Sequence, residues 1–325
     1  MGTVVISLDA ELAWGFHDFQ QLPQHRIKNA RSSWSHLVNL FEEFDIPATW
    51  AIVGHLFLEE CDGEHSEHPS TINWFNNDPG QTIQENPNWF GPDLVKEVVE
   101  SDVDHDIGSH SFSHVEFGRS DTTEDTAKAE ISTCVELAQK QDINPESFVF
   151  PRNNIGKKDL PSWIGDLLRE NGFVCYRGSQ PDSKGLKNLT RRLVRLSGGR
   201  TGPPIVEPSI DSNGLVNIPA SLYLFSFEGE QDTLVKKVGQ AVSQTVFSVV
   251  SHDPIPRQVK LGLEKVKQTD DGILHLWMHP NNITGQSDFT RMKAVLKTIN
   301  DYRDEENVDV KTMRGIAKNV KNKNK

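Results

Sequence analysis

The sequence predicts an α/β fold in which parallel strands and covering helices form a closed or nearly closed barrel. Three observations support this prediction. Short apolar runs alternate with amphipathic helical patterns along the whole chain. About seven strand–helix units fit a chain of 325 residues. Polar residues that can carry chemistry follow the expected strands, as they do at the active face of barrel enzymes.

The expected strands are short buried runs rich in β-branched and aromatic residues. They cover residues 4–8, 48–54, 147–150, 173–176, 215–225 and 272–278. The expected helices show apolar residues at helical spacing, with Thr122 or Thr123 capping one helix and Gly172 ending another. These helices cover residues 30–44, 92–101, 122–140, 160–171, 233–248 and 287–301.

We expect a single domain over residues 1–310. From Lys311 to Lys325 the chain turns basic, with Lys-Asn repetition at its end, so residues 311–325 are predicted to form a flexible tail.

Composition excludes several classes of function. The net charge of −12 argues against nucleic acid as a partner, and no apolar run is long enough for a membrane span. The three cysteines are widely spaced, which is typical of a reducing compartment rather than of a disulfide framework. Neither a basic start nor a long apolar stretch precedes the first strand, so the expected location is cytoplasmic.

The stretch His105–His114 contains the strongest indication of chemistry. His110 and His114 are four residues apart, which brings both rings to one side of a helix or a single turn. Two imidazoles in this arrangement suit one divalent metal ion, with a carboxylate and water completing the coordination. The alternative interpretation is a pair of surface or capping histidines, and the two are equally supported by this stretch alone.

Two carboxylates, Asp9 and Glu11, follow the first expected strand. Charged groups in such a place are costly unless cations meet them. With them, the residues that follow expected strands are Asp9, Glu11, His110, His114, Arg152, Arg177 and His279. In a barrel these positions meet at one face, which favours a functional site over chance scatter.

Two long loops, over residues 61–90 and 178–214, interrupt the alternation. Loops of this length are often functional when they carry aromatic residues. The histidines of the first loop, His65 and His68, are predicted to be solvated rather than metal-binding. The sequence leaves open whether the two loops close over the site or face a partner.

Taken together, these motifs resemble those of the polysaccharide deacetylase family, whose shared region is called the NodB homology domain. The resemblance extends from Val4 to about Ile283. It is carried by five segments, namely 7–11, 47–50, 105–114, 150–153 and 278–280, of which 105–114 resembles the family's His-Ser/Thr-x-x-His metal motif. The family fold is an irregular barrel of the (β/α)7 type, which agrees with the pattern of elements.

The resemblance implies roles for particular residues. His110, His114 and a carboxylate would bind a divalent metal ion, Zn²⁺ or a similar ion, and Asp9 would be the catalytic base. Arg152 would pair with that base, and His279 would donate a proton to the leaving amine. Trp14 and Asn153 would contact the sugar substrate, with ordinary packing as the alternative for Trp14.

The first motif departs from the family pattern. The family has a second, adjacent Asp as metal ligand, and this chain has Ala10 there. Glu11 is the candidate replacement, and the reverse assignment, with Asp9 as ligand and Glu11 as base, stays open. The family's fourth motif has no clear counterpart in this chain.

Three functions follow from the resemblance. The leading hypothesis is a metal-dependent hydrolase, acting on a carbon–nitrogen bond, that removes an N-acetyl or other acyl group from an amino sugar in a glycan or glycan precursor. The second is an allantoinase-like amidohydrolase acting on a small amide. The third is a non-catalytic barrel that has lost its metal and binds a glycan or a partner protein. The oligomeric state is not predicted.

Overall fold

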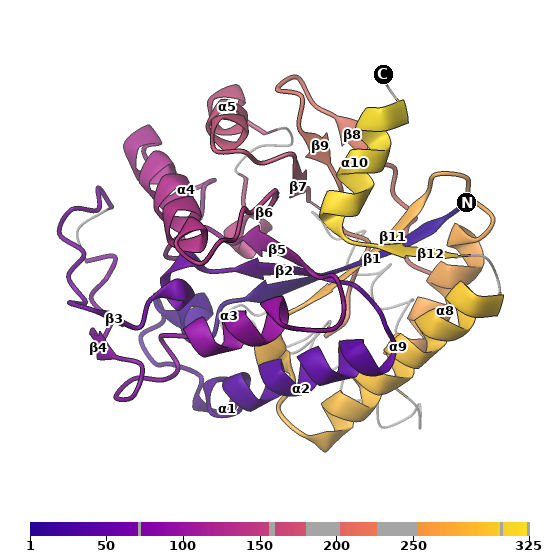
Figure 1. The fold of residues 1–325 in the computed structure, drawn as a ribbon, viewed down its shortest axis with the longest axis horizontal. Coiled ribbons are helices and arrows are strands. Elements are labelled where there is room, and N and C mark those ends of the chain that lie inside the picture. Colours follow the sequence, from indigo (N-terminus) through magenta and orange to yellow (C-terminus); the bar gives the residue numbers. More distant parts are fainter. Residues whose placement is uncertain (71–72, 156–159, 180–201, 226–252, 306–307, 324–325) are drawn as a thin grey trace, which may run out of the picture.

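A mostly parallel sheet around β1 (Thr3–Ala10) forms the centre of the molecule (Figure 1). The structure is a computed structural model, and it describes residues 1–325 except 71–72, 156–159, 180–201, 226–252, 306–307 and 324–325. The strands lie in the order β10-β11-β1-β2-β5-β6-β7-β9-β8, and β12 also pairs with β1. Besides β1 they are β2 (Thr49–Ile52), β5 (Asp106–Ser109), β6 (Ser147–Val149), β7 (Cys175–Arg177), β8 (Ser209–Ile210), β9 (Val216–Asn217), β10 (Leu222–Tyr223), β11 (Ile273–Met278) and β12 (Asp309–Lys311). A small antiparallel pair, β3 (Glu60–Cys61) and β4 (Gln81–Thr82), lies apart from this sheet.

The segment from β9 to β10 brings the two ends of the sheet together. The Ile218 amide donates to the Tyr176 carbonyl of β7, and three residues later the Ser221 amide donates to the His275 carbonyl of β11. The sheet therefore curls around, and the predicted α/β fold of the irregular barrel type is confirmed.

Helices surround the curled sheet (Figure 1). They are α1 (Gln24–Ile27), α2 (Ala30–Glu43), α3 (Pro92–Val99), α4 (Glu124–Gln139), α5 (Ser162–Glu170), α8 (Pro254–Val266), α9 (Gln286–Glu305) and α10 (Met313–Lys323). The Thr123 side chain accepts the Thr126 amide, as the predicted cap of α4 should. Helix α8 was not among the predicted helices; Pro254 occupies its first turn, where no amide donor is needed.

The predicted helix over 233–248 lies outside the described residues, as does most of the loop 178–214. Within the described ranges, no helix combines the length and apolar character that a membrane span requires. The cysteines Cys61, Cys134 and Cys175 are all free thiols.

Strand β1 lies at the centre of the core, and all eight of its residues are buried. Val4, Ile6 and Leu8 pack into the larger apolar cluster, whereas Val5 belongs to a smaller cluster that includes residues of α10. Burial on both faces explains the continuous apolar run in this strand. It also means that Asp9, near the end of β1, lies in a buried environment.

The C-terminal segment corrects the prediction of a flexible tail over 311–325. Residue Lys311 ends β12, and residues 313–323 form α10, whose Met313, Ile316 and Ala317 are buried against the barrel. The Arg314 amide, in the first turn of α10, donates to the buried carboxylate of Asp106 at 3.1 Å. The basic composition concealed this helix because its lysines and asparagines occupy the solvent face, while three apolar residues at helical spacing form the packed face.

Candidate active site

The polar residues that follow the strands converge, as the barrel prediction requires. Asp9 and Glu11 come from the end of β1, His110 follows β5, and His279 follows β11. These strands are neighbours or near neighbours in the sheet, so their carboxyl ends bring the four side chains to one place.

Glu11, His110 and His114 form a compact group of possible metal ligands. Their ligand atoms all lie within 4.8 Å of one another, and all three residues are buried. The Glu11 Oε2 atom lies 3.1 Å from His114 Nε2 and 3.6 Å from His110 Nε2.

The two histidines are brought together by a sharply turned loop and not by a helix. Ser111 and His114 both have positive φ angles, of 63° and 65°, so the chain reverses within the His110–His114 stretch. Glu130 of α4 stabilises this loop. Its carboxylate accepts hydrogen bonds from the Ser113 amide, at 2.8 Å, and from the Ser113 hydroxyl. The centroids of the His110 and His114 rings therefore lie 5.1 Å apart.

The state of His110 supports a cation at this group. Its Nδ1 atom lies 2.7 Å from the Val149 carbonyl oxygen, which can only accept, so Nδ1 carries the proton. In the neutral ring Nε2 then carries a lone pair. It is buried, faces the Glu11 carboxylate and has no hydrogen-bond partner within the described ranges. Two nitrogen ligands and one carboxylate suit Zn²⁺ or a similar divalent ion, and a carbonyl behind the first histidine is the usual orienting contact. The residues present thus fit a divalent metal ion.

Asp9 forms a bidentate ion pair with Arg177. The guanidinium donates two hydrogen bonds to the two carboxylate oxygens, at 2.6 and 2.7 Å, and both side chains are almost completely buried. Arg177 is fixed in turn by Ser7 Oγ at 3.0 Å and Asn153 Oδ1 at 3.1 Å, and its guanidinium carbon lies 4.6 Å from the centre of the Trp277 ring. A planar guanidinium matches a carboxylate in this two-point geometry.

The electrostatics keep both carboxylates ionised. Burial alone would raise the pKa of Asp9, but Arg177 and His110 outweigh it and hold that pKa below its ordinary value. Burial is likewise outweighed at Glu11, where His279, His110 and His114 hold the pKa well below its ordinary value. For His114 burial prevails over the nearby Glu11 and lowers the pKa of the imidazole, which favours the neutral, ligand-competent ring.

His279 faces both carboxylates. Its Nε2 atom lies 3.7 Å from Asp9 Oδ2 and 3.7 Å from Glu11 Oε1, and its side chain is 21% exposed. On its other side, the Tyr223 hydroxyl lies 3.4 Å from Nδ1, and the Asn282 side-chain oxygen accepts the His279 amide at 2.8 Å. The ring therefore has one nitrogen turned to the carboxylates and enough exposure to meet a substrate.

The predicted pairing of Arg152 with the base is wrong in this structure. Arg152 has a left-handed backbone, with φ at 53°, and its side chain is 34% exposed, whereas the Asp9 side chain is buried. Arg152 pairs with Asp18 and Glu116 instead. The partner of Asp9 is Arg177, which the sequence placed at the end of a strand without giving it a role.

The predicted contact of Trp14 with a sugar also needs correction, whereas that of Asn153 stays a prediction. Trp14 is completely buried, and its indole packs against His55 and Trp89, so it has no exposed face for a sugar. This is the packing alternative that the sequence had left open. Asn153 is engaged with Arg177, so its contact in the structure is to the site's own arginine.

Several site residues were missed by sequence reasoning. Asn281 donates to Glu11 Oε1 at 3.3 Å, and Glu130 supports the loop that carries His114. Asn281 directly follows His279-Pro280, so its place after the last strand was a usable indication. Glu130 lies on the helical face of α4 that also carries Ile131 and Cys134, and only its burial reveals its role.

Residues 18–159 match the family model described as polysaccharide deacetylase. This match confirms the resemblance drawn from the motifs, and it confirms the predicted class of enzyme, a hydrolase that acts on the carbon–nitrogen bonds of acetylated sugars. The matched segment contains His110 and His114, whereas Asp9, Glu11, Arg177 and His279 lie outside it.

The fold is similar to several solved structures. One is a protein from Mycobacterium smegmatis assigned as a polysaccharide deacetylase, which is 15% identical with a TM-score of 0.60, covering 99% of this chain and 91% of that one. Puue allantoinase is 13% identical with a TM-score of 0.53, covering 97% and 89% of the two chains. A GH57-type branching enzyme from Pyrococcus horikoshii is 9% identical with a TM-score of 0.53, covering 98% and 70%. At these identities the likeness shows a shared fold. No curated protein matches the sequence.

Proposed function

We propose that this protein is a metal-dependent hydrolase that removes an N-acetyl or related acyl group from an amino sugar in a glycan or glycan precursor. The observation that carries the proposal is the buried group of Glu11, His110 and His114 beside the Arg177-paired carboxylate of Asp9. The family match supports the acylated-sugar substrate class.

The metal ligands in this proposal are Glu11, His110 and His114, and the ion is Zn²⁺ or a similar divalent ion. When bound, the ion supplies a Lewis acid that polarises the acyl carbonyl and makes water more acidic. Glu11 thereby replaces the ligand that Ala10 cannot provide, since its longer side chain reaches both imidazoles from the next position in the chain.

Asp9 is assigned as the general base. Both of its oxygens accept hydrogen bonds from Arg177, which keeps it ionised and fixes its orientation, whereas Glu11 lies closer to the imidazoles. This difference favours Glu11 as ligand and Asp9 as base over the reverse assignment. Asp9 takes one proton from the water that attacks the acyl carbon.

His279 is assigned as the general acid. The carbon–nitrogen bond breaks with its electron pair going to nitrogen, and a protonated His279 supplies the proton that makes this nitrogen an amine leaving group. Its partial exposure and its position beside both carboxylates suit this role. The products are a carboxylic acid and the free amino sugar.

The decisive experiment measures acetate release from N-acetylglucosamine oligosaccharides by the zinc-loaded protein, with allantoin hydrolysis assayed in parallel. We expect the wild type to release acetate. His110→Ala should lose this activity and should also lose about one equivalent of bound metal. His25→Ala, at an exposed position of α1, is the matched control and keeps both. Acetate release that survives His110→Ala would rule out the metal mechanism. Hydrolysis of allantoin alone would favour the amidohydrolase alternative. Neither activity, with no metal lost in His110→Ala, would favour the non-catalytic barrel.

A further inference from the structure

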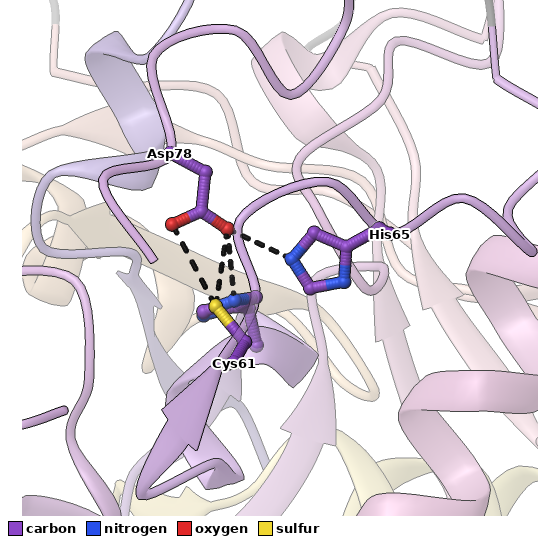
Figure 2. Close-up of side chains that lie close together, drawn as sticks. Cys61, His65 and Asp78 are labelled. Atoms are coloured by element: carbon purple, nitrogen blue, oxygen red, sulfur yellow. Dashed lines mark hydrogen bonds and ion pairs between the residues drawn. The ribbon is translucent and has the colours of Figure 1, made fainter. Parts of the chain in front are cut away.

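A second group of metal-ligating side chains lies in the first long loop, outside the candidate active site. It comprises His55, Cys61, His65 and Asp78, whose ligand atoms all lie within 4.8 Å of one another. His55 follows β2 in the barrel, whereas the other three belong to the loop. Figure 2 shows Cys61 and His65 pointing toward the Asp78 carboxylate.

His55 provides the observation that points to a bound cation. Its Nδ1 atom lies 3.2 Å from the Trp89 carbonyl oxygen, an acceptor only, so the proton of the neutral ring is on Nδ1. Nε2 then carries a lone pair and lies 3.2 Å from Asp78 Oδ2, in side chains that are both 0% exposed, and it has no hydrogen-bond partner among the residues that the structure describes. A lone pair aimed at a buried carboxylate is repulsive unless a cation lies between them.

The remaining distances suit a tetrahedral ion. Ligand bonds of about 2.1 Å place neighbouring ligand atoms about 3.4 Å apart. His65 Nε2 lies 2.8 Å and Cys61 Sγ lies 3.5 Å from Asp78 Oδ2. The other carboxylate oxygen of Asp78 accepts the Gly80 amide at 3.0 Å, which fixes the carboxylate. Small shifts of the His65 ring would therefore complete the geometry.

The backbone holds the ligands in place. Gly63 and Gly80 have φ angles of 76° and 60°, and a Cβ atom on Gly63 would lie 2.9 Å from the Gly80 nitrogen. Only glycine permits this close approach, which brings Cys61 and His65 beside Asp78. The rings of Phe75 and Trp14 pack against His65 and His55, at centroid distances of 4.5 and 4.4 Å.

We propose that His55, Cys61, His65 and Asp78 bind a structural Zn²⁺ ion that fastens the loop to the barrel. A thiolate, two imidazoles and a carboxylate are all groups that bind Zn²⁺, and four protein ligands fill a tetrahedral ion, so that no position is left for substrate. The prediction that His65 and His68 are solvated is wrong, since their side chains are only 12% and 6% exposed and His68 pairs with Glu130.

The loop that this ion fastens also supports the active site. The Trp74 indole donates to Ser113 Oγ at 2.9 Å, within the turn that carries His114. Loss of the structural ion is therefore expected to lower activity indirectly.

Cobalt substitution tests the proposal, because Cys61 is the only sulfur among the two ligand groups. The Co²⁺-loaded protein should show a thiolate-to-cobalt charge-transfer band in the near ultraviolet. The band should disappear in Cys61→Ala and persist in His110→Ala. Absence of the band from the wild-type protein, or its persistence in Cys61→Ala, would overturn the proposal and leave a metal-free His–Asp cluster.

Zinc stoichiometry separates this site from the proposed catalytic one. We expect two equivalents in the wild type and one each in His65→Ala and His110→Ala, with His25→Ala as the unchanged control. If the proposed catalytic site holds no metal, the wild type binds one equivalent and the cobalt band is still present. In the His110→Ala background, a chelator should lower the melting temperature, and adding Cys61→Ala should remove that chelator effect. A melting temperature insensitive to chelator in His110→Ala alone would contradict a structural ion.

Discussion

Arg177 holds Asp9 through two short hydrogen bonds, although the sequence motif had pointed to Arg152. Strand β7 delivers Arg177 from inside the barrel, whereas Arg152 lies on a turn at the surface, with its side chain 34% exposed. The barrel therefore provides the same chemical function, a cation that keeps the base ionised, from a different strand.

Replacing Arg177 by Lys should lower kcat/KM by about 10²- to 10³-fold, because an ammonium cannot orient both oxygens of the base. The measurement is steady-state acetate release, with urea unfolding to verify that the variant is folded. Arg152→Lys is the matched control, and it should change kcat/KM by no more than about fivefold, the size of an exposed ion pair. Equal losses in the two variants would contradict the assignment.

Replacing Trp14 by Phe tests whether this residue belongs to the core. We expect a loss of about 1–3 kcal/mol in the free energy of unfolding, because the change leaves space and removes the indole donor to the Trp89 carbonyl. The KM for an acetylated oligosaccharide should stay within about twofold, since a buried ring cannot stack on a sugar. A large rise in KM without loss of stability would restore the predicted sugar contact.

Replacing Met313 by Ala should cost about 2–5 kcal/mol of stability, because this fully buried side chain anchors α10 to the barrel. Urea unfolding measures the loss. Asn319→Ala, at an exposed position of the same helix, should change stability by less than about 0.5 kcal/mol. Equal stability of the two variants would mean that α10 contributes little and that the segment behaves as the predicted tail.

Buried histidines should make the protein less stable in mild acid. Burial lowers the pKa of His105 to about 4, while the unfolded chain has a value near 6.5. Between these values the unfolded state binds more protons, so stability is complete above about pH 6.5 and is lost as the pH falls toward 4. His17 and His275, with pKa values lowered by burial to about 4 and about 3, act in the same direction.

His105→Asn isolates one such contribution. In the wild type, His105 Nδ1 accepts a hydrogen bond from the Ala48 amide at 3.1 Å. The side-chain oxygen of the asparagine can still accept this bond, but asparagine does not titrate. Urea unfolding at pH 7 and pH 5 should show that the variant loses about 2 kcal/mol less than the wild type over this interval. Equal losses would mean that His105 is protonated in the folded protein.

The order of the elements and the two histidines of the site could be read from the sequence, because both depend on local patterns. Alternating strands and helices fix a barrel-like topology, and residues that follow its strands meet at one face. Asp9, Glu11, His110, His114 and His279 were therefore placed together correctly. The helix over 313–323 escaped prediction because a basic, asparagine-rich surface outweighed three apolar residues in a short window.

The sequence by itself thus determined the fold class and the group of carboxylates and imidazoles. Only the tertiary structure decided which arginine meets Asp9 and that Trp14 is part of the core. It likewise decided that His55 faces three residues of the loop that follows it, Cys61, His65 and Asp78. The physical reason is that the Arg177–Asp9 and Trp14–His55 contacts join residues 168 and 41 positions apart, and that the shape of the His55 loop depends on positive φ angles at Gly63 and Gly80. Side-chain direction at such positions follows from the packing of the whole barrel, and no local pattern encodes it.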